Sequence, residues 1–246
     1  MNDVIATLTK RKSDRSFTDQ PIPDDVLDAV IEAGHKAPTS KNGQHVSVVV
    51  VRDPSRRAKL AEYAGNQPWV AKAPVFLVVV YDMQKINLAC EAIDKTMELQ
   101  NCVEGVLVGG VDCGITLAAM QTAANSLGLG TVPIGGIRNN PQEVIDFLGL
   151  PPCTFAMIGL CLGYVNKHSL IRPRLPLSTF RHDESYNLTP LRESVATYNE
   201  ELIAFWASQG RTDGKSWSEA IGPSYSCNER PKIRPTFTKQ GMTFQD

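Results

Sequence analysis

Two short runs of β-branched residues constrain the fold of this chain more than any other feature. They are VSVVVVR at 46–52 and VFLVVVY at 75–81. Both runs are nearly continuously apolar rather than alternating, which indicates strands that are covered on both faces of a sheet. Two later runs, TVPIG at 131–135 and FAMIGLCLG at 155–163, predict two more strands.

Helical patterns surround these strands. Pro23 suits a first helical position, acidic residues follow it, and Gly34 is predicted to end that helix. Residues 105–127 predict a long central helix, because they are rich in Gly, Ala and Val and apolar nearly all round. Further helices are predicted near 141–148 and at about 190–208. Beyond the last helix the sequence predicts an irregular tail, which we interpret as an arm around a second subunit.

The stretch VEGVLVGGVDCGITLAAM approaches the length of a membrane span, but Glu104 and Asp112 interrupt it. Because charges at a bilayer centre are costly, we expect a buried helix of a soluble protein and no membrane partner. The residues before Arg15 lack the apolar core of a signal peptide, so export is not expected. The expected location is the cytoplasm.

The cysteines and histidines show no spacing that is typical of a metal site. Six cysteines contain no CxxC pair, and four histidines contain no HxxxH pair. We interpret the cysteines as buried thiols of a reducing compartment rather than as a disulfide framework or a metal site.

The formal net charge of −1 gives no reason to expect a polyanionic partner for the whole molecule. A nucleic-acid-binding module would need a wider basic stripe and aromatic platforms, which this chain lacks. Positive charge is nevertheless concentrated in LTKRKSDRSF at 8–17 and in RPRLP at 172–176. The charges of these lysines and arginines, the planar guanidinium groups of the arginines and the hydroxyl of Ser13 all suit a phosphate. Each cluster alone is equally consistent with solvated surface charge.

Several familiar motifs are absent. GLGTVPIGG at 128–136 carries Pro133 where a dinucleotide fingerprint needs its third glycine, and a helix precedes it instead of a strand. The chain contains neither a P-loop nor a GxSxG nucleophile elbow. Two polar loops remain, APTSKNGQH at 37–45 and GNQPW at 65–69, and each of them alone could be an ordinary surface loop.

Taken together and in order, these segments resemble the nitroreductase superfamily. The resemblance is closest to its FMN-carrying flavin reductases and oxygen-insensitive, NADPH-preferring nitroreductases. It covers essentially the whole chain and rests on the motifs RKSDRSF, APTSKNGQ, GNQPWVAKAP, AANSLGLGTVPIGGIRNNP, IGLCLGY, RPRLP and NERP.

The resemblance implies an α+β fold with a central mixed, mainly antiparallel β-sheet flanked by helices. It implies one nitroreductase-like domain over residues 1–246. Within it, 1–165 would form the core, and 166–246 a basic loop, a helix and a C-terminal extension. That extension would wrap the partner subunit of a homodimer.

The resemblance also implies one FMN at each of two subunit interfaces. The basic turn and Arg174 would hold its phosphate and ribityl chain, while Arg172 would lie near the N1–C2=O edge of the ring. The loop at 39–41 would come from the other subunit. The residues implied in FMN binding are Arg11, Lys12, Ser13, Arg15, Thr39, Ser40, Lys41, Gln67, Ile134, Gly135, Gly136, Arg172 and Arg174.

A second set of residues is implied in binding NAD(P)H or the acceptor. These residues are Lys41, Asn42, Arg211, Lys215 and Arg230. Gln209 stands where NADPH-preferring members carry an arginine for the 2′-phosphate, and Arg211 and Lys215 could replace that arginine. The sequence therefore leaves the choice between NADPH and NADH open. Lys12 also departs from the usual arginine at its position.

The implied activity is ping-pong hydride transfer from NAD(P)H through flavin N5 to a nitroaromatic, quinone, azo compound or free flavin. No catalytic side chain or metal is expected, since a cation near N1 and glycines that let the backbone approach the ring suffice. The alternative is a protein that stores or delivers FMN with little turnover.

Overall fold

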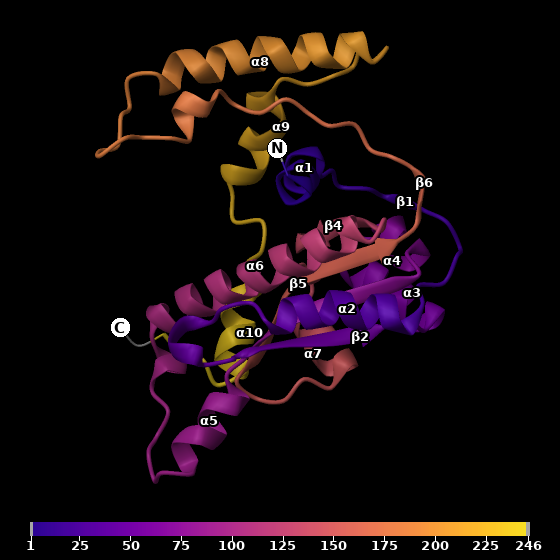
Figure 1. Ribbon diagram of the computed structural model, residues 1–246. Coiled ribbons are helices and arrows are strands. Elements are labelled where there is room, and N and C mark those ends of the chain that lie inside the picture. Colours follow the sequence, from indigo (N-terminus) through magenta and orange to yellow (C-terminus); the bar gives the residue numbers. More distant parts are fainter. Residues whose placement is uncertain (1, 245–246) are drawn as a thin grey trace. The chain divides into compact units, whose positions relative to one another are not determined.

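The computed structural model describes residues 2–244, which divide into two compact units. The first unit comprises Met1–Ser169 and Arg230–Asp246, and the second comprises Leu170–Glu229 (Figure 1). The chain therefore leaves the first unit after Ser169 and returns to it at Arg230.

A four-stranded sheet with the order β2–β3–β5–β4 forms the centre of the first unit. Its strands are β2 (Val46–Val51), β3 (Val75–Asp82), β4 (Gly130–Ile134) and β5 (Thr154–Gly163). Every pairing among the described strands is antiparallel, including that of the short β1 (Ser16–Phe17) with β6 (Val165–Lys167). The four predicted strands are confirmed, and so is the α+β fold.

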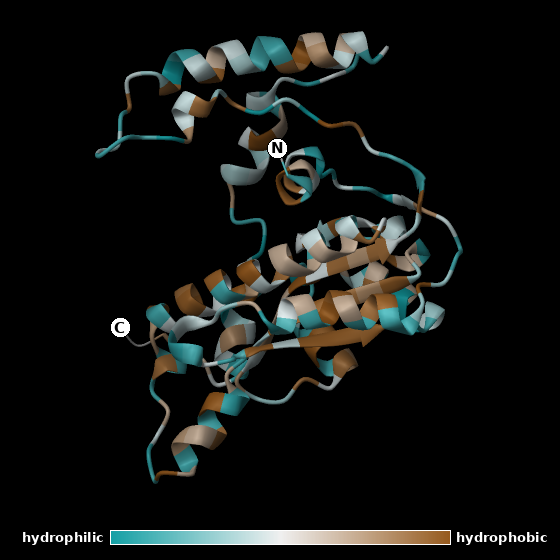
Figure 2. Cartoon of the chain, in the orientation of Figure 1, coloured by the Kyte–Doolittle hydropathy of each residue, from teal (hydrophilic) through white to brown (hydrophobic). Residues whose placement is uncertain are grey.

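β3 lies between two strands and is buried along almost its whole length, as its apolar run predicts. The strands of the sheet are largely hydrophobic (Figure 2). β2 is one of the two edge strands; of its residues only Val51 is buried, and Val50 is 42% exposed. The prediction that both runs are covered on both faces is therefore wrong for β2, because the helices that bury β3 leave this edge strand only partly covered.

Helices cover both faces of the sheet. Alternate β3 residues point to opposite faces. Leu77 and Val79 pack with α2, α6 and α10, whereas Phe76 and Val78 pack with α3, α4 and α7. The helices of the first unit are α1 (Asp3–Lys10), α2 (Asp24–His35), α3 (Pro54–Tyr63), α4 (Pro68–Lys72), α5 (Gln84–Glu91), α6 (Val103–Ser126), α7 (Pro141–Leu148) and α10 (Ile233–Lys239).

α6 is the longest helix in the described part of the chain, and it runs beside α2 along the sheet (Figure 1). By length and composition alone it could cross a membrane. Here it buries Asp112, Cys113 and Met120 within the first unit, as a core helix does.

α2 does not end at Gly34, as its sequence predicts, but continues to His35. A Cβ on Gly34 would lie 2.6 Å from Cγ of Met120 on α6. The glycine therefore serves the close approach of two helices and does not terminate one of them.

The second unit contains α8 (Leu191–Ser208) and α9 (Trp217–Tyr225). α8 confirms the helix predicted at about 190–208. The prediction of an irregular tail after it is wrong, because both α9 and α10 follow. Proline interrupts both short helices, which weakens their periodicity, yet the capping box of Ser216 and Glu219 was a readable start signal for α9.

All six cysteines are free thiols. Cys113 and Cys161 are buried, and burial raises the pKa of Cys113 to about 12. Cys227 is exposed, so the prediction of buried thiols is wrong for it, because it follows α9 on the surface of the second unit.

Candidate functional site

The basic turn follows the end of α1 and is fixed by one buried carboxylate. Asp14 is only 3% exposed, and its Oδ1 accepts a hydrogen bond of 2.7 Å from the backbone N–H of Ser169. Its own backbone N–H donates to the carbonyl of Thr131 at 3.0 Å. These two hydrogen bonds connect the turn to β4 and to the segment after β6, so the backbone that carries its cations is held in place.

Arg11 and Lys12 line a hollow of about 470 Å³ beside this turn. Lys10 and His168 also line it, together with Asp14 and the loop that follows α6. Nδ1 of His168 lies 3.3 Å from Oδ2 of Asp14. Three permanent cations against the two carboxylates of Asp3 and Asp14 still favour an anion in this hollow, and arginine offers a planar fork for a phosphate.

Arg15 points to a different neighbourhood from Arg11 and Lys12. Its guanidinium lies over the ring of Trp69, 5.3 Å from the centroid, and donates to the carbonyl of Ser13 at 3.1 Å. The indole Nε1–H donates to Oε1 of Gln67 at 3.0 Å. Arg15 and Gln67, which are both expected to bind FMN, are therefore joined through Trp69, a residue that the sequence reading did not single out.

The glycine turn after β4 packs on the Gln67 loop. A Cβ on Gly136 would lie 2.3 Å from Nε2 of Gln67 and 2.4 Å from the carbonyl oxygen of Ala64. Ile134 is buried at the end of β4, whereas Gly135 is half-buried. The structure thus brings Arg15, Gln67 and 134–136 together, although Gly136 follows Arg15 by 121 positions in the sequence.

Arg138 is a cation beside this turn that the sequence reading missed. It donates to the carbonyl of Met157, and a Cβ on Gly135 would lie 3.5 Å from its Nη2. Burial lowers the pKa of Arg138, and the nearby charge of Arg230 lowers it further. Nε of Arg230 donates to Oδ1 of Asn139 at 3.2 Å. The motif IGGIRNN contains Arg138, but only Ile134, Gly135 and Gly136 of this motif were predicted to bind the flavin.

Thr39, Ser40, Lys41 and Asn42 lie against α6 rather than beside Arg15. The backbone N–H of Ser40 donates to Oδ2 of Asp112 at 2.9 Å. Lys41 and Asn42 adopt left-handed φ angles of 52° and 56°. Their side chains are exposed, so this loop presents polar groups to solvent from a fixed base.

Two of the four predicted site residues of the second unit lie over the ring of Trp206. The guanidinium carbons of Arg172 and Arg211 lie 5.0 Å and 4.7 Å from the centroid of its ring. Nε of Arg211 is 3.4 Å from Oδ1 of Asp213, and this hydrogen bond lowers the pKa of that carboxyl. Arg174 and Lys215 are exposed. A guanidinium that stacks on an aromatic face keeps its in-plane N–H donors available to an anion.

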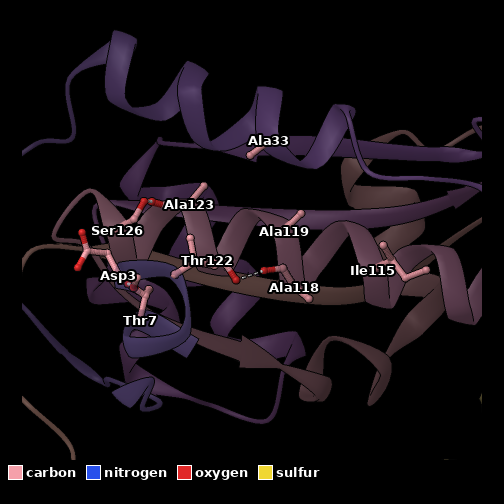
Figure 3. Close-up of a pocket in the computed structure, with 10 residues that line it drawn as sticks. Asp3, Thr7, Ala33, Ile115, Ala118, Ala119, Thr122, Ala123 and Ser126 are labelled. Carbon is pink, nitrogen blue, oxygen red and sulfur yellow. Dashed lines mark hydrogen bonds between the residues drawn. The ribbon is translucent and has the colours of Figure 1, made fainter. Parts of the chain in front are cut away.

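An apolar groove of about 660 Å³ lies between α1, α2 and α6 (Figure 3). Val4, Ala33, Ile115 and Ala119 are among the residues that line it. The outer face of α6 continues this surface, because it exposes Val103, Leu107 and Val111. Large exposed apolar patches typically mark interaction surfaces.

Two family models match this chain. The model described as the nitroreductase family matches residues 8–164, and the model of the C-terminal domain of that family matches residues 172–245.

Two curated relatives match almost end to end. An FMN reductase [NAD(P)H] of Bacillus subtilis is 44% identical over 98% of this chain and 98% of its own length. An NADPH-flavin oxidoreductase of Vibrio harveyi is 35% identical over 98% of this chain and 99% of its own length.

Two solved structures are similar over nearly the full chain. NfrA2 of B. megaterium has a TM-score of 0.97 at 38% identity and covers 100% of both chains. The NADPH:FMN oxidoreductase of Vibrio harveyi complexed with NAD+ has a TM-score of 0.88 at 33% identity, covering 98% of this chain and 99% of its own.

Proposed function

Because the chain belongs to the nitroreductase family, we propose that it is an FMN-dependent NAD(P)H oxidoreductase. The observation that carries the proposal is the grouping of Arg15, Gln67 and the glycine turn at 134–136 beside a basic turn with a hollow. When bound, FMN supplies the atom N5, which takes a hydride from NAD(P)H and passes two electrons to an acceptor.

The residues of the first unit fit a flavin mononucleotide. The hollow beside Arg11 and Lys12 suits a phosphate, and Ser13 adds a hydroxyl. Gly135 has an open side, since Nη2 of Arg138 is the nearest atom that a Cβ there would meet. A flat ring can therefore approach this backbone closely. We assign these residues, with Arg15, Gln67, Ile134 and Gly136, to FMN binding.

The predicted arginines and lysine of 172–230 would stabilise negative charge on the flavin, the nicotinamide donor and the acceptor. Arg172 and Arg174 are assigned to the flavin, because a positive charge near N1 stabilises the ring after two-electron reduction. Arg211 and Lys215 are assigned to the 2′-phosphate of NADPH, and Arg230 to the acceptor pocket. The protein then needs no acid–base side chain, because its task is to stack the nicotinamide and the acceptor on one open face in turn.

The apolar surface on α1 and α6 supports a homodimer. A second copy of this chain would cover the groove in Figure 3 and the exposed valines and leucine of α6. In such a dimer Thr39, Ser40, Lys41 and Asn42 would reach the flavin of the partner subunit. The exposed Phe180 and Tyr186 of the second unit suit an arm around that partner.

A visible absorption spectrum of the purified protein, repeated anaerobically with NADPH or NADH, tests the proposal. We expect an oxidised-flavin band that bleaches on addition of the nicotinamide and returns with menadione or a nitrofuran. A protein that stores or delivers FMN would show the band but negligible turnover. A colourless protein that cannot be reconstituted with FMN would contradict the proposed function.

A further inference from the structure

We propose that Asp112 and His45 are positioning residues that hold the loop at 39–44 in the conformation in which it meets flavin and substrate. The proposal rests on the proposed function, and it concerns a buried pair of a carboxylate and an imidazole to which no role has been assigned above. Both side chains lie beneath the loop, one on α6 and the other at the start of β2.

The pair is almost completely buried and closely packed. Asp112 is 3% exposed and His45 is 4% exposed. Nε2 of His45 lies 2.9 Å from Oδ2 of Asp112, and the ring of His45 packs edge-on against that of Tyr81. A buried carboxylate is stable only when its lone pairs are satisfied, so its partners are fixed in place.

The same carboxylate oxygen also holds the loop. Oδ2 of Asp112 accepts the backbone N–H of Ser40 at 2.9 Å, in the middle of the polar segment. From the other end of the loop, a Cβ on Gly43 would lie 2.7 Å from Nδ1 of His45. The loop thus rests on both members of the pair, on one side by a hydrogen bond and on the other by close packing.

The backbone of the loop is strained at the residues whose side chains are exposed. Three residues of the loop have left-handed φ angles, which are 52° at Lys41, 56° at Asn42 and 52° at Gln44. Residues other than glycine rarely adopt this region. All three side chains are exposed. Such strain persists only where neighbouring groups impose it. Lys85 adds a further restraint, because its Nζ donates to the carbonyl of Gln44 at 3.0 Å.

This arrangement explains the presence of Asp112 and His45 in the core of the first unit. Without an anchor the strained loop would relax, and its polar side chains would no longer point toward the ligand. The buried carboxylate oxygen of Asp112 accepts the N–H of Ser40, and such a hydrogen bond is stronger than one to a neutral acceptor. The pair therefore acts through the loop and does not itself touch flavin or substrate.

Two variants test the device from opposite sides. Asp112→Asn keeps the shape of the side chain but removes its charge, whereas Gly43→Ala pushes a methyl group against His45 from the loop. Thr116→Val is the matched control, since Thr116 is equally buried one turn further along α6. If Asp112→Asn does not fold, Gly43→Ala decides the question, because it lies in the loop and leaves the core pair intact.

The first measurement is the rate at which trypsin cuts after Lys41 in the flavin-free protein. We expect both variants to be cut at least several-fold faster than the wild type and the control, because local opening exposes the bond. The second is the dissociation constant for FMN from flavin fluorescence, which we expect to rise about tenfold with the loss of a charge-assisted hydrogen bond. The KM for the acceptor should rise similarly, with a smaller change in kcat.

The outcomes separate this inference from the proposed function. A wild type that neither binds FMN nor oxidises NAD(P)H would overturn the function. A wild type that does both, with variants whose cleavage rate, FMN affinity and KM stay within about twofold of it, would overturn the positioning role. Faster cleavage without a change in FMN affinity or KM would also overturn it, since the loop would then be held for no functional purpose.

Discussion

Single residues in the first unit fix geometry that a surface turn could not maintain by itself. Asp14 is buried and binds the backbone of Ser169, so the cations around it start from a rigid base. Gly136 contributes through the absence of a side chain, which lets the turn after β4 contact the Gln67 loop. Both effects depend on atoms that lie far away in the sequence.

Substitution of Gly136 by alanine should cost both stability and flavin. The new Cβ would lie 2.4 Å from the backbone oxygen of Ala64, which cannot move aside cheaply. We expect Gly136→Ala to lower the free energy of unfolding by about 1–3 kcal/mol and the protein to be purified with little FMN. The measurements are thermal unfolding and the ratio of flavin to protein absorbance.

Gly222→Ala is the control for this substitution, since a Cβ on Gly222 in α9 would meet nothing within 4 Å. We expect it not to lower the unfolding free energy and to raise it by at most about 1 kcal/mol, because alanine favours a helix more than glycine does. If Gly136→Ala retained wild-type stability and full flavin content, the glycine turn would not be the close contact that the geometry indicates.

At the scale of elements, α8 organises the segment that precedes it. Tyr198, Leu202 and Trp206 recur at every fourth residue and form its buried stripe. Tyr198 donates to the carbonyl of Pro173 at 2.8 Å, and Trp206 carries Arg172 on its ring. The helix thereby sets the course of the basic RPRLP segment.

Trp206 of this stripe also contacts Arg211, whose guanidinium lies over its ring. This contact bears on the choice between NADPH and NADH. Changing both Arg211 and Lys215 to alanine should raise the KM for NADPH about tenfold or more, because a 2′-phosphate would lose charge-assisted hydrogen bonds. The KM for NADH should stay within about twofold, since NADH lacks that phosphate. Steady-state kinetics with both donors measures the difference, and Arg181→Ala, an exposed arginine paired with Asp183, is the control. Equal effects on the two donors would place the 2′-phosphate elsewhere.

At the scale of the whole molecule, α1 and α6 leave an apolar surface exposed to solvent. Leu107 and Val111 are 59% and 60% exposed on the outer face of α6. A site that draws loop 39–44 from a second copy would be incomplete in a monomer.

The double change Leu107→Glu and Val111→Glu should therefore produce a monomer with little FMN. Two unpaired charges cannot be buried against an apolar partner surface without a large cost. Size-exclusion chromatography with light scattering and the flavin absorbance measure the two effects. Leu88→Glu on α5 is the control, because Leu88 is similarly exposed but lies outside this surface. A double variant that remains dimeric, or a wild type that is already monomeric, would contradict the proposed interface.

Local patterns in the sequence determined the elements whose periodicity is strong. The β-branched runs predicted the positions of β2 and β3, two later apolar runs predicted those of β4 and β5, and the helix predicted near 141–148 is α7. The same patterns misread Gly34, because a glycine that ends a helix and one that admits a neighbouring helix look alike in sequence.

By itself, then, the sequence determined the strands, the long helix and the chemical character of the loops, because these properties depend on residues within one or two turns of each other. Only the tertiary structure decided which groups meet. It placed Asp112 under Ser40 and His45, Arg15 over Trp69, and Gly136 against Gln67. Contacts of this kind join segments far apart in the chain, and they form only after the sheet and α6 have packed, so no local period encodes them.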